Sequence, residues 1–490
     1  MNEILKQLSA CGKRLTPDAI KTLEEFMAER DVDDQLLISS INKIEDAIVT
    51  KEMVDGVISE IEKVSRPVLV VESNRGFDPI AKEYSPNVRI IKEYDVTSNS
   101  RTTGSVDNFV HYFRDRYKKI RDMLKLRPGD VSLLDIKYAK KHKGERLRIV
   151  AMVNEKTMSK KGNVIIRCED LTDDLLVVVP KETAAFSLKD TIIEDEVIMF
   201  EGKMLDRMFI ADEIIRPETP INKKVKTIED DLAVAYISDM HVGSNVFLEG
   251  VFKRFVSWLS GRFGDRAEIE LAGKVKYIVI AGDIVDGIGI YPEQENELLI
   301  KDIFEQYTAF NELISNIPDY ISLIVSPGNH DAVRRAEPQP AIPKNMIDER
   351  VIRLGNPGWI NIEGLIHLVY HGRGLDAIIS NLPNMSFLEP ERSMVEMLKR
   401  RHLSPMYGKN LIIPEEKDYL VIHEIPDVFH TAHVHRNAYK LYKGIHLVNS
   451  GTFQARTTYQ VKLGHYPTPG IVSVLELKTG IMHTINLMDR

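Results

Sequence analysis

The hydrophobic pattern of the first 64 residues has the period of helices. Apolar side chains recur at three- and four-residue spacings, as at Ile20, Leu23 and Met27, and this spacing predicts amphipathic helices. The tripeptide Thr-Pro-Asp at 16–18 marks a helix start, because proline suits the first helical position. We therefore expect residues 1–70 to form a helical N-terminal domain, a small bundle or docking module without chemistry of its own.

A polar stretch and a basic segment follow. Residues 71–106 end in DVTSNSRTTGSV, whose small and polar residues are typical of a linker, so we expect a flexible linker there. Residues 107–126, DNFVHYFRDRYKKIRDMLKL, have the pattern of an amphipathic helix. Its basic face could contact nucleic acid or a partner, or it could be an ordinary solvated face.

Between residues 130 and 215 the pattern changes to short runs rich in valine and isoleucine, separated by turns. About five strands in about 85 residues fit a small barrel of the oligonucleotide-binding type. We therefore assign residues 107–219 to the basic helix plus this barrel. Such barrels bind single strands by stacking bases on aromatic side chains. A structural or partner-facing barrel is an equal alternative, because the region has few aromatic residues: Tyr138, Phe186, Phe200 and Phe209.

From residue 228 onward, apolar runs alternate with helical stretches. LAVAYIS (232–238), KYIVIAG (276–282) and SLIVSPG (322–328) are continuous apolar runs, the pattern of strands that are buried on both faces. Three more such runs follow. We expect residues 228–490 to form an α/β two-sheet sandwich, within a chain whose overall fold class is multidomain α+β.

Each predicted strand ends in side chains that can bind metal ions. Open sheets place their sites at the carboxyl ends of strands, and residues two apart in an extended chain point to the same side. A single aspartate after a strand is more often a cap, and a single buried histidine is more often only hydrogen-bonded. Their recurrence at five strand ends favours one shared metal site. The candidate ligands are Asp239, His241, Asp283, Asn329, His371, His433 and His435.

This donor set restricts the metal. Carboxylate, amide and imidazole ligands without cysteine suit Mn²⁺, Fe or Zn better than Ca²⁺ or a thiolate zinc site. Two ions about 3.5–4 Å apart need a bridging carboxylate, and Asp283, alone in Gly-Asp-Ile, is the natural bridge. Twelve of the 14 histidines follow residue 240, which directs attention to the predicted sandwich. We expect two divalent metal ions, Mn²⁺ first and Fe or Zn as alternatives.

Length and charge narrow the class of protein. A chain of 490 residues accommodates about three domains. The 65 Lys+Arg and 73 Asp+Glu residues give a net charge of −8, which excludes a strongly basic DNA coat but not a local basic groove. No run of about 18 apolar residues could span a membrane, and the first residues lack a secretory signal. The two cysteines, Cys11 and Cys168, form no CxxC motif. We expect a cytoplasmic protein with no membrane partner.

The motifs at the strand ends resemble those of the calcineurin-like metallophosphoesterase superfamily, which includes double-strand-break repair nucleases. That superfamily usually has glycine before the first histidine of its last motif, whereas this chain has Ala432, another small residue. The motifs that carry the resemblance are Asp239-x-His241, Gly282-Asp283, Gly328-Asn329-His330-Asp331, His371-Gly372 and His433-x-His435.

The order of the segments narrows the resemblance. A helical head, a Ser/Thr-rich linker, the DNFVHYFRDRYKKI helix, a barrel and a phosphoesterase domain are similar to the small subunits of archaeal family-D DNA polymerases, as is YHGRGLDAII. The resemblance covers essentially the whole chain and is strongest from residue 106 to residue 490. The related eukaryotic polymerase B-subunits have lost most metal ligands. This chain keeps them all, which argues for activity.

The resemblance implies roles for the candidate residues. One ion would be held by Asp239, His241, Asp283 and His435, and the other by Asp283, Asn329, His371 and His433. His330 would be catalytic, close to the scissile phosphate. The implied reaction is 3′→5′ exonucleolytic hydrolysis of DNA with an unpaired 3′ end, and the implied partner is a large catalytic polymerase subunit. Nearby arginines could contact the DNA backbone or be ordinary solvated or salt-bridged side chains: Arg334, Arg335, Arg373 and Arg456.

Two rival functions fit the same motifs. A metallophosphatase acting on small phosphoesters would use the same ligands, although it would need neither the barrel nor the N-terminal module. A non-catalytic scaffold subunit would hold the polymerase and keep the ligands only as vestiges, although the ligand set is intact.

Overall fold

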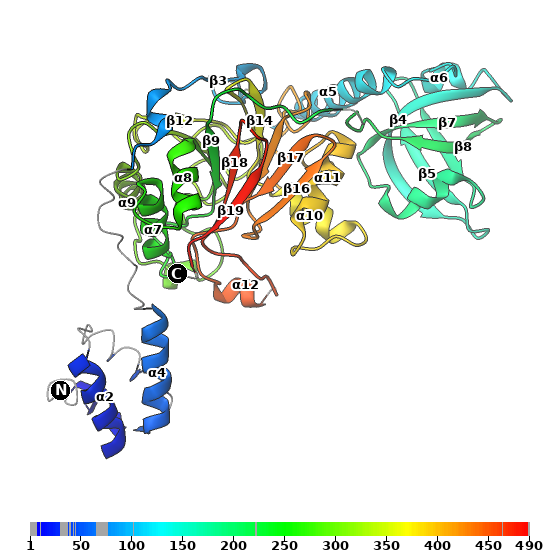
Figure 1. Cartoon of the computed structure of the whole chain (residues 1–490). Coiled ribbons are helices and arrows are strands. Elements are labelled where there is room, and N and C mark those ends of the chain that lie inside the picture. The colour runs from blue at the N-terminus through cyan, green and yellow to red at the C-terminus, as the bar shows by residue number, and fades with distance from the viewer. Residues whose placement is uncertain are drawn as a thin grey trace. The chain divides into compact units, whose positions relative to one another are not determined.

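The computed structural model consists of two compact units, residues 1–71 and residues 72–489 (Figure 1). It describes residues 77–100, 102–220, 223–462 and 464–488, and in the N-terminal unit residues 7–9, 11–29, 38, 41–42, 44 and 46–64. No helix in these ranges is long and apolar enough to cross a membrane.

The described residues of the N-terminal unit include the helices α2 (Pro17–Glu29) and α4 (Lys51–Val64) and also a small sheet. Helix α2 begins at the predicted proline, and α4 packs against it. The strands β1 (Arg14–Leu15) and β2 (Ile48–Val49) form a two-stranded parallel pair that the sequence did not predict. Two-residue strands are too short to leave a periodic signal in a sequence.

The prediction of a flexible linker over residues 71–106 is wrong for residues 77–100. The short helix η1 (Ile80–Glu83) packs Ala81 into the main core, and β3 (Val88–Ile90) pairs antiparallel with β13 (Gly358–Ile362). A second short helix, η2 (Lys92–Tyr94), follows. The polar run that indicated a linker begins at Asp95, which is buried and accepts a hydrogen bond from the Thr97 backbone N–H at 2.8 Å, so its polar side chains serve local structure. Two parts of the predicted linker, residues 71–76 and residue 101, lie outside the described residues.

The basic segment forms the helix α5 (Val106–Lys125), which Ser105 caps. One face is buried, with Tyr112, Arg116 and Tyr117 among its members. Arg116 Nε lies 2.8 Å from Asp418 Oδ2, and both side chains are fully enclosed. This part of the basic face therefore fixes the helix to the large domain and is neither solvated nor free for nucleic acid.

The predicted five-stranded barrel is confirmed. Its strands form a closed sheet in the order β4-β5-β6-β8-β7, in which β6 and β8 are parallel. A short helix, α6 (Ile136–Ala139), precedes the barrel, and η3 (Ala184–Thr191) lies between β6 and β7. The barrel interior holds Ile149, Ile166 and Phe200, all fully buried. The strand bounds are β4 (Arg146–Met158), β5 (Val164–Glu169), β6 (Asp174–Val179), β7 (Val197–Met204) and β8 (Met208–Ile215).

The rest of the large unit is a sandwich of two six-stranded sheets, as the apolar runs predict. One sheet has the order β12-β11-β10-β9-β18-β19, and the other has the order β16-β17-β15-β14-β13-β3. The bounds in the first sheet are β9 (Ala233–Ile237), β10 (Val275–Ala281), β11 (Ser322–Ser326), β12 (Val351–Arg353), β18 (Ile471–Glu476) and β19 (Met482–Asn486). In the second they are β14 (Leu365–Val369), β15 (Val428–Thr431), β16 (Ala438–Tyr442) and β17 (Ile445–Asn449).

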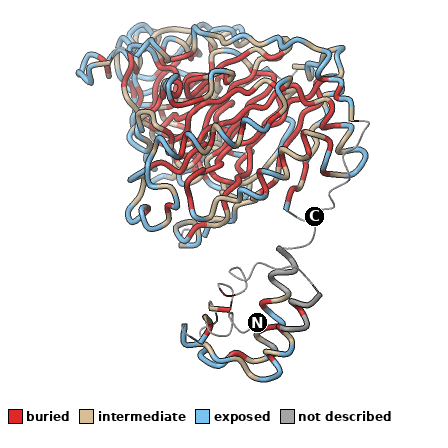
Figure 2. Tube along the Cα trace, turned by 90° about the vertical axis from the view of Figure 1, so that its left-hand side faces the viewer, coloured by how far each residue is buried: buried red, intermediate tan, exposed pale blue. Residues whose placement is uncertain are grey.

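Successive residues of the central strands face opposite layers. Val234 and Tyr236 of β9 lie in the core between the sheets, whereas Ala233 and Ala235 lie under the outer helices. The helices α7 (Glu249–Leu259), α8 (Arg266–Lys274) and α9 (Ile303–Ser315) cover the first sheet, and α10 (Gly374–Asn381) and α11 (Pro390–Arg400) cover the second. Figure 2 shows the resulting continuous buried interior of this unit. Strands covered on both sides explain the continuous apolar runs.

Candidate metal centre

The candidate ligands stand on loops at the carboxyl ends of parallel strands. Strands β9, β10 and β11 run parallel to one another in one sheet, and β14 and β15 do so in the other. Their ends therefore meet at the same edge of the sandwich. The candidate residues that follow these five strands are, in chain order, Asp239 and His241, then Asp283, then Asn329 and His330, then His371, then His433 and His435.

The backbone of these loops is strained. Asp239, His241, Asp283, His433 and His435 all have positive φ, between 48° and 72°. Only twelve non-glycine residues have positive φ among the described residues, so five of them gather at this one edge. Such conformations cost about 1–3 kcal/mol each and persist where the surrounding structure holds them for a function.

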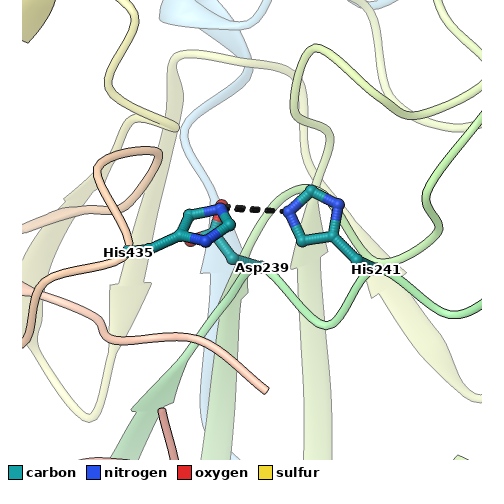
Figure 3. A group of neighbouring side chains, drawn as sticks. All are labelled: Asp239, His241 and His435. Carbon is teal, nitrogen blue, oxygen red and sulfur yellow. Dashed lines mark hydrogen bonds and ion pairs between the residues drawn. The ribbon is translucent and has the colours of Figure 1, made fainter. Parts of the chain in front are cut away.

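Three side chains from two strand ends form the first cluster (Figure 3). The Nε2 atoms of His241 and His435 are 3.1 Å apart. His435 Nε2 lies 3.4 Å from Asp239 Oδ1, and His241 Nε2 lies 4.0 Å from the same oxygen. All three residues are buried.

Asp283 is the centre of a second group. Its Oδ2 atom lies 3.2 Å from His371 Nε2 and 3.9 Å from the Nε2 atoms of both His241 and His330. His433 joins Asp283 and His371 in a group whose possible ligand atoms all lie within 4.8 Å of one another. Asn329 Oδ1 lies 3.0 Å from His371 Nε2. One carboxylate oxygen thus lies between the first cluster and the second.

The shorter distances between these atoms, from 3.0 to 3.4 Å, fit ligands of one metal ion. Ligand atoms bound about 2.0–2.2 Å from one ion lie about 2.8–3.6 Å apart when the bond angles are about 90–110°. Asp239 Oδ1 is buried and has no hydrogen-bond partner among the described residues. A buried carboxylate oxygen is costly without a partner, so a cation at this place would satisfy it. The donors are carboxylate, amide and imidazole groups, a set that suits Mn²⁺, Fe or Zn.

The far sides of the imidazoles are held by other groups. His241 Nδ1 lies 3.0 Å from Asp286 Oδ1, and His371 Nδ1 donates to the Ala281 carbonyl at 2.7 Å. His433 Nε2 lies 2.9 Å from Asp376 Oδ2. Partners of this kind fix the orientation and tautomer of metal-binding histidines.

Sequence reasoning did not identify several of these supporting residues. Asp286 lies three residues after Asp283, and Asp376 lies five residues after His371, so closeness to the motifs was the available signal. Gln460, whose amide nitrogen lies 2.8 Å from His435 Nδ1, gave no signal. It comes from the short helix α12 (Thr458–Lys462), more than twenty residues beyond the last motif.

The carboxylates make the centre favour positive charge. Burial would lower the pKa of His371, but the charge of Asp283, with help from Asp239, raises it to about 10. Burial would raise the pKa of Asp283, but His371 and His330 hold it well below the usual range. Burial and the charge of Asp283 raise the pKa of Asp331 to about 7. Divalent cations would supply the positive charge that the imidazolium of His371 otherwise provides.

The centre opens into a cavity of about 390 Å³. His330 lines it, with Nδ1 held 2.7 Å from the Asp286 carbonyl oxygen. Arg335 and Arg373 also line the cavity. Arg334 does not contribute to its lining, because it forms an ion pair with Glu415 at 2.9 Å. This arginine is therefore a structural side chain.

A model of the calcineurin-like phosphoesterase family matches residues 232–437. The DNA polymerase II small subunit of Methanothermobacter thermautotrophicus is 38% identical over 489 residues, which are 97% of this chain and 98% of that protein. The proteins of the same name from Methanocaldococcus jannaschii and Archaeoglobus fulgidus are 40% and 42% identical. Those matches cover 81% of this chain and 68% of the first protein, and 79% of this chain and 78% of the second.

The match to the Methanothermobacter thermautotrophicus protein extends over nearly the full length of both chains. The domain that matches the phosphoesterase family also contains the cluster of candidate metal ligands. The chain therefore belongs to the family of archaeal DNA polymerase II small subunits, and its sandwich is a calcineurin-like phosphoesterase domain.

Proposed function

We propose that this chain is a polymerase small subunit that hydrolyses DNA from the 3′ end, as a metal-dependent 3′→5′ exonuclease. The observation that carries the proposal is the position of Asp283. Its Oδ2 atom lies within 4 Å of imidazole nitrogens from three other strand ends, which is the place of a bridging carboxylate. Membership of a polymerase-subunit family supports DNA as the substrate.

The geometry supports two sets of ligands that share Asp283. Asp239, His241, Asp283 and His435 would hold one ion, and Asp283, Asn329, His371 and His433 would hold the other. Mn²⁺ is our first choice of metal, with Fe or Zn as alternatives, because all donors are oxygen or nitrogen atoms. Cys168 does not compete, since it is buried in the barrel.

Two bound divalent cations supply an activated water molecule and neutralise charge on the phosphate during hydrolysis. His330 suits the leaving-group side of the reaction. Its Nδ1 is engaged by the Asp286 carbonyl, so Nε2 is the atom available to a substrate in the cavity. Burial lowers the pKa of His330, although Asp283 opposes this effect. Because Nδ1 donates to the Asp286 carbonyl, Nε2 of the neutral ring is an acceptor. In the protonated ring Nε2 would be the atom that gives a proton to the leaving 3′-oxygen, a contribution of about 10²–10⁴-fold.

The cavity favours an unpaired strand end. A volume of about 390 Å³ is at the small end of ligand pockets, so a nucleotide enters more easily without its base-pairing partner. Unpairing and unstacking cost a few kcal/mol, and least at a mismatched or single-stranded end. Arg335 and Arg373 in the cavity wall offer positive charge to the phosphates. These features support proofreading of a mismatched 3′ end.

A large catalytic subunit would be the partner in this function. The relatives are named small subunits of a polymerase, and this chain shows no polymerase signature in its own sequence. We expect the complex to act on DNA in the cytoplasm, with synthesis by the large subunit and removal of misincorporated nucleotides by this one.

The test is hydrolysis by the full chain, alone and with its large subunit, of single-stranded and 3′-mismatched DNA in the presence of Mn²⁺. We expect nucleotide release by the wild type and losses of at least about 10²-fold for Asp239→Ala and His330→Ala. His142→Ala, at an exposed histidine before the barrel, is the matched control.

Three outcomes contradict the proposal. If the wild type releases no nucleotides, neither alone nor with its large subunit, the chain is not a nuclease. Full activity of both variants excludes this centre. Hydrolysis of a simple phosphomonoester but not of DNA indicates a metallophosphatase. Co-purification of Asp239→Ala with the large subunit separates a scaffold role from catalysis.

A further inference from the structure

One wall of the cavity at the metal centre is aromatic and carries no candidate ligand. Phe387 and His465 line it together. Phe387, in the segment between α10 and α11, packs on the core beneath the second sheet. The ring of His465 rests on it, with the ring centroids 4.4 Å apart and the planes inclined by 33°. Neither ring is needed to hold a metal ion.

The His465 ring is tied to the metal centre through α12. The backbone N–H of His465 donates to the Gln460 carbonyl oxygen at 2.9 Å. The side-chain amide nitrogen of Gln460 in turn lies 2.8 Å from His435 Nδ1. Burial lowers the pKa of His465, and the charges of His433, His435 and Arg456 lower it further against the opposing charge of Asp376. The lowered pKa favours the uncharged imidazole, whose ring can act as an aromatic surface.

An arginine and a tyrosine, Arg456 and Tyr466, flank α12 in the sequence and lie outside the cavity lining. The guanidinium of Arg456 lies 4.3 Å from the centroid of Tyr466, a ring that is 58% exposed. Arg456 Nε is buried and has no hydrogen-bond partner among the described residues. Of these side chains, only Phe387 and His465 face the cavity, and aromatic rings are the features on which proteins stack the bases of single-stranded nucleic acid.

We propose that Phe387 and His465 form a stacking site for the base of the 3′-terminal nucleotide. The inference rests on the proposed exonuclease function and specifies how its substrate is selected. A base in this site is unpaired, because a stacked duplex cannot insert one base between the wall and the metal centre. Selection of frayed or mismatched ends is then a property of the wall and not of the metal ligands.

The test compares two oligonucleotides that differ only at the 3′-terminal nucleotide, which carries either a base or an abasic tetrahydrofuran. The full chain, in complex with its large subunit and with Mn²⁺, should hydrolyse the base-containing end about tenfold faster in kcat/KM, since stacking of one base is worth about 5- to 150-fold. In His465→Ala this preference should fall to about one. In His465→Phe it should persist, because the ring and not the imidazole nitrogen provides the surface.

Leu388→Ala is the matched control, since this neighbouring side chain is 47% exposed and lies outside the cavity lining. It should keep the tenfold preference. A preference that survives in both His465→Ala and Phe387→Ala overturns the stacking site, as does equal loss in His465→Ala and His465→Phe. A wild type that hydrolyses both substrates equally also overturns it, whereas a wild type that hydrolyses neither contradicts the exonuclease function itself.

Discussion

Replacement of Gly328 by alanine should disable the centre although it changes no candidate ligand. A Cβ atom at this position would lie 2.2 Å from Asp283 Oδ1 and 2.7 Å from His371 Cε1, where ordinary contact begins at 3.4 Å. Both neighbours are enclosed and fixed, Asp283 Oδ1 by the backbone N–H of His330 and His371 by the Ala281 carbonyl. Both must therefore move, each by about 1 Å, which costs about 1–3 kcal/mol of stability.

A displacement of about 1 Å at a catalytic centre reduces the rate by about 10²-fold. We expect Gly328→Ala to bind Mn²⁺ at least about tenfold more weakly in a calorimetric titration and to release nucleotides about 10²-fold more slowly. Gly250→Ala is the control, because its added Cβ meets nothing within 4 Å and alanine is favoured within a helix. Wild-type Mn²⁺ affinity and rate in Gly328→Ala would refute the assignment of Asp283 and His371 to one centre.

Three further predictions concern the stability and the metal dependence of the chain. Asp418→Ala leaves the enclosed Arg116 without its anionic partner and should lower the free energy of unfolding in urea by about 3–5 kcal/mol. Asp122→Ala, at an exposed ion pair, should cost less than about 1 kcal/mol, and similar losses for the two would contradict this reasoning. Burial lowers the pKa of His367 and His402 to about 4, below about 6.5 in the unfolded chain. Unfolding then takes up protons at these two groups, so their own contribution to the free energy of unfolding should be constant above pH 6.5 and fall by up to about 3 kcal/mol per group between pH 6.5 and 4; a difference in urea stability between wild type and His367→Gln that is the same at pH 7.5 and pH 4.5 contradicts it. Removal of divalent ions with EDTA should abolish DNA hydrolysis, and Mn²⁺ should restore it, whereas hydrolysis that persists in excess EDTA excludes a metal mechanism.

The order of elements in the large unit could be predicted because each layer leaves a local signal. The barrel strands have short β-rich runs between turns, and the sandwich strands have continuous apolar runs because helices and a second sheet cover them. Residues 77–100 were predicted incorrectly because the three-residue strand β3 owes its position to hydrogen bonds with β13, more than 260 residues away. A contact at that sequence separation leaves no periodic signal in the strand itself.

The arginines illustrate the same limit. Four of them follow the motifs, and sequence alone could not distinguish their surroundings. Arg335 and Arg373 line the cavity, whereas Arg334 forms an ion pair with Glu415. The guanidinium of Arg456 lies over the ring of Tyr466. The charge of an arginine is set by its type, but what the charge acts on is set by neighbours that packing brings to it.

The sequence by itself determined which donor atoms are present and that each follows a strand, because side-chain chemistry and strand patterning are local properties. Only the tertiary structure decided the distances between those donors. His241 and His435 lie 194 positions apart and belong to different sheets, yet their Nε2 atoms are 3.1 Å apart. That separation results from the packing of two sheets over one core and from strained loops at their shared edge. The same packing brings Phe387, His465 and Gln460 to the candidate centre from segments that carry no motif.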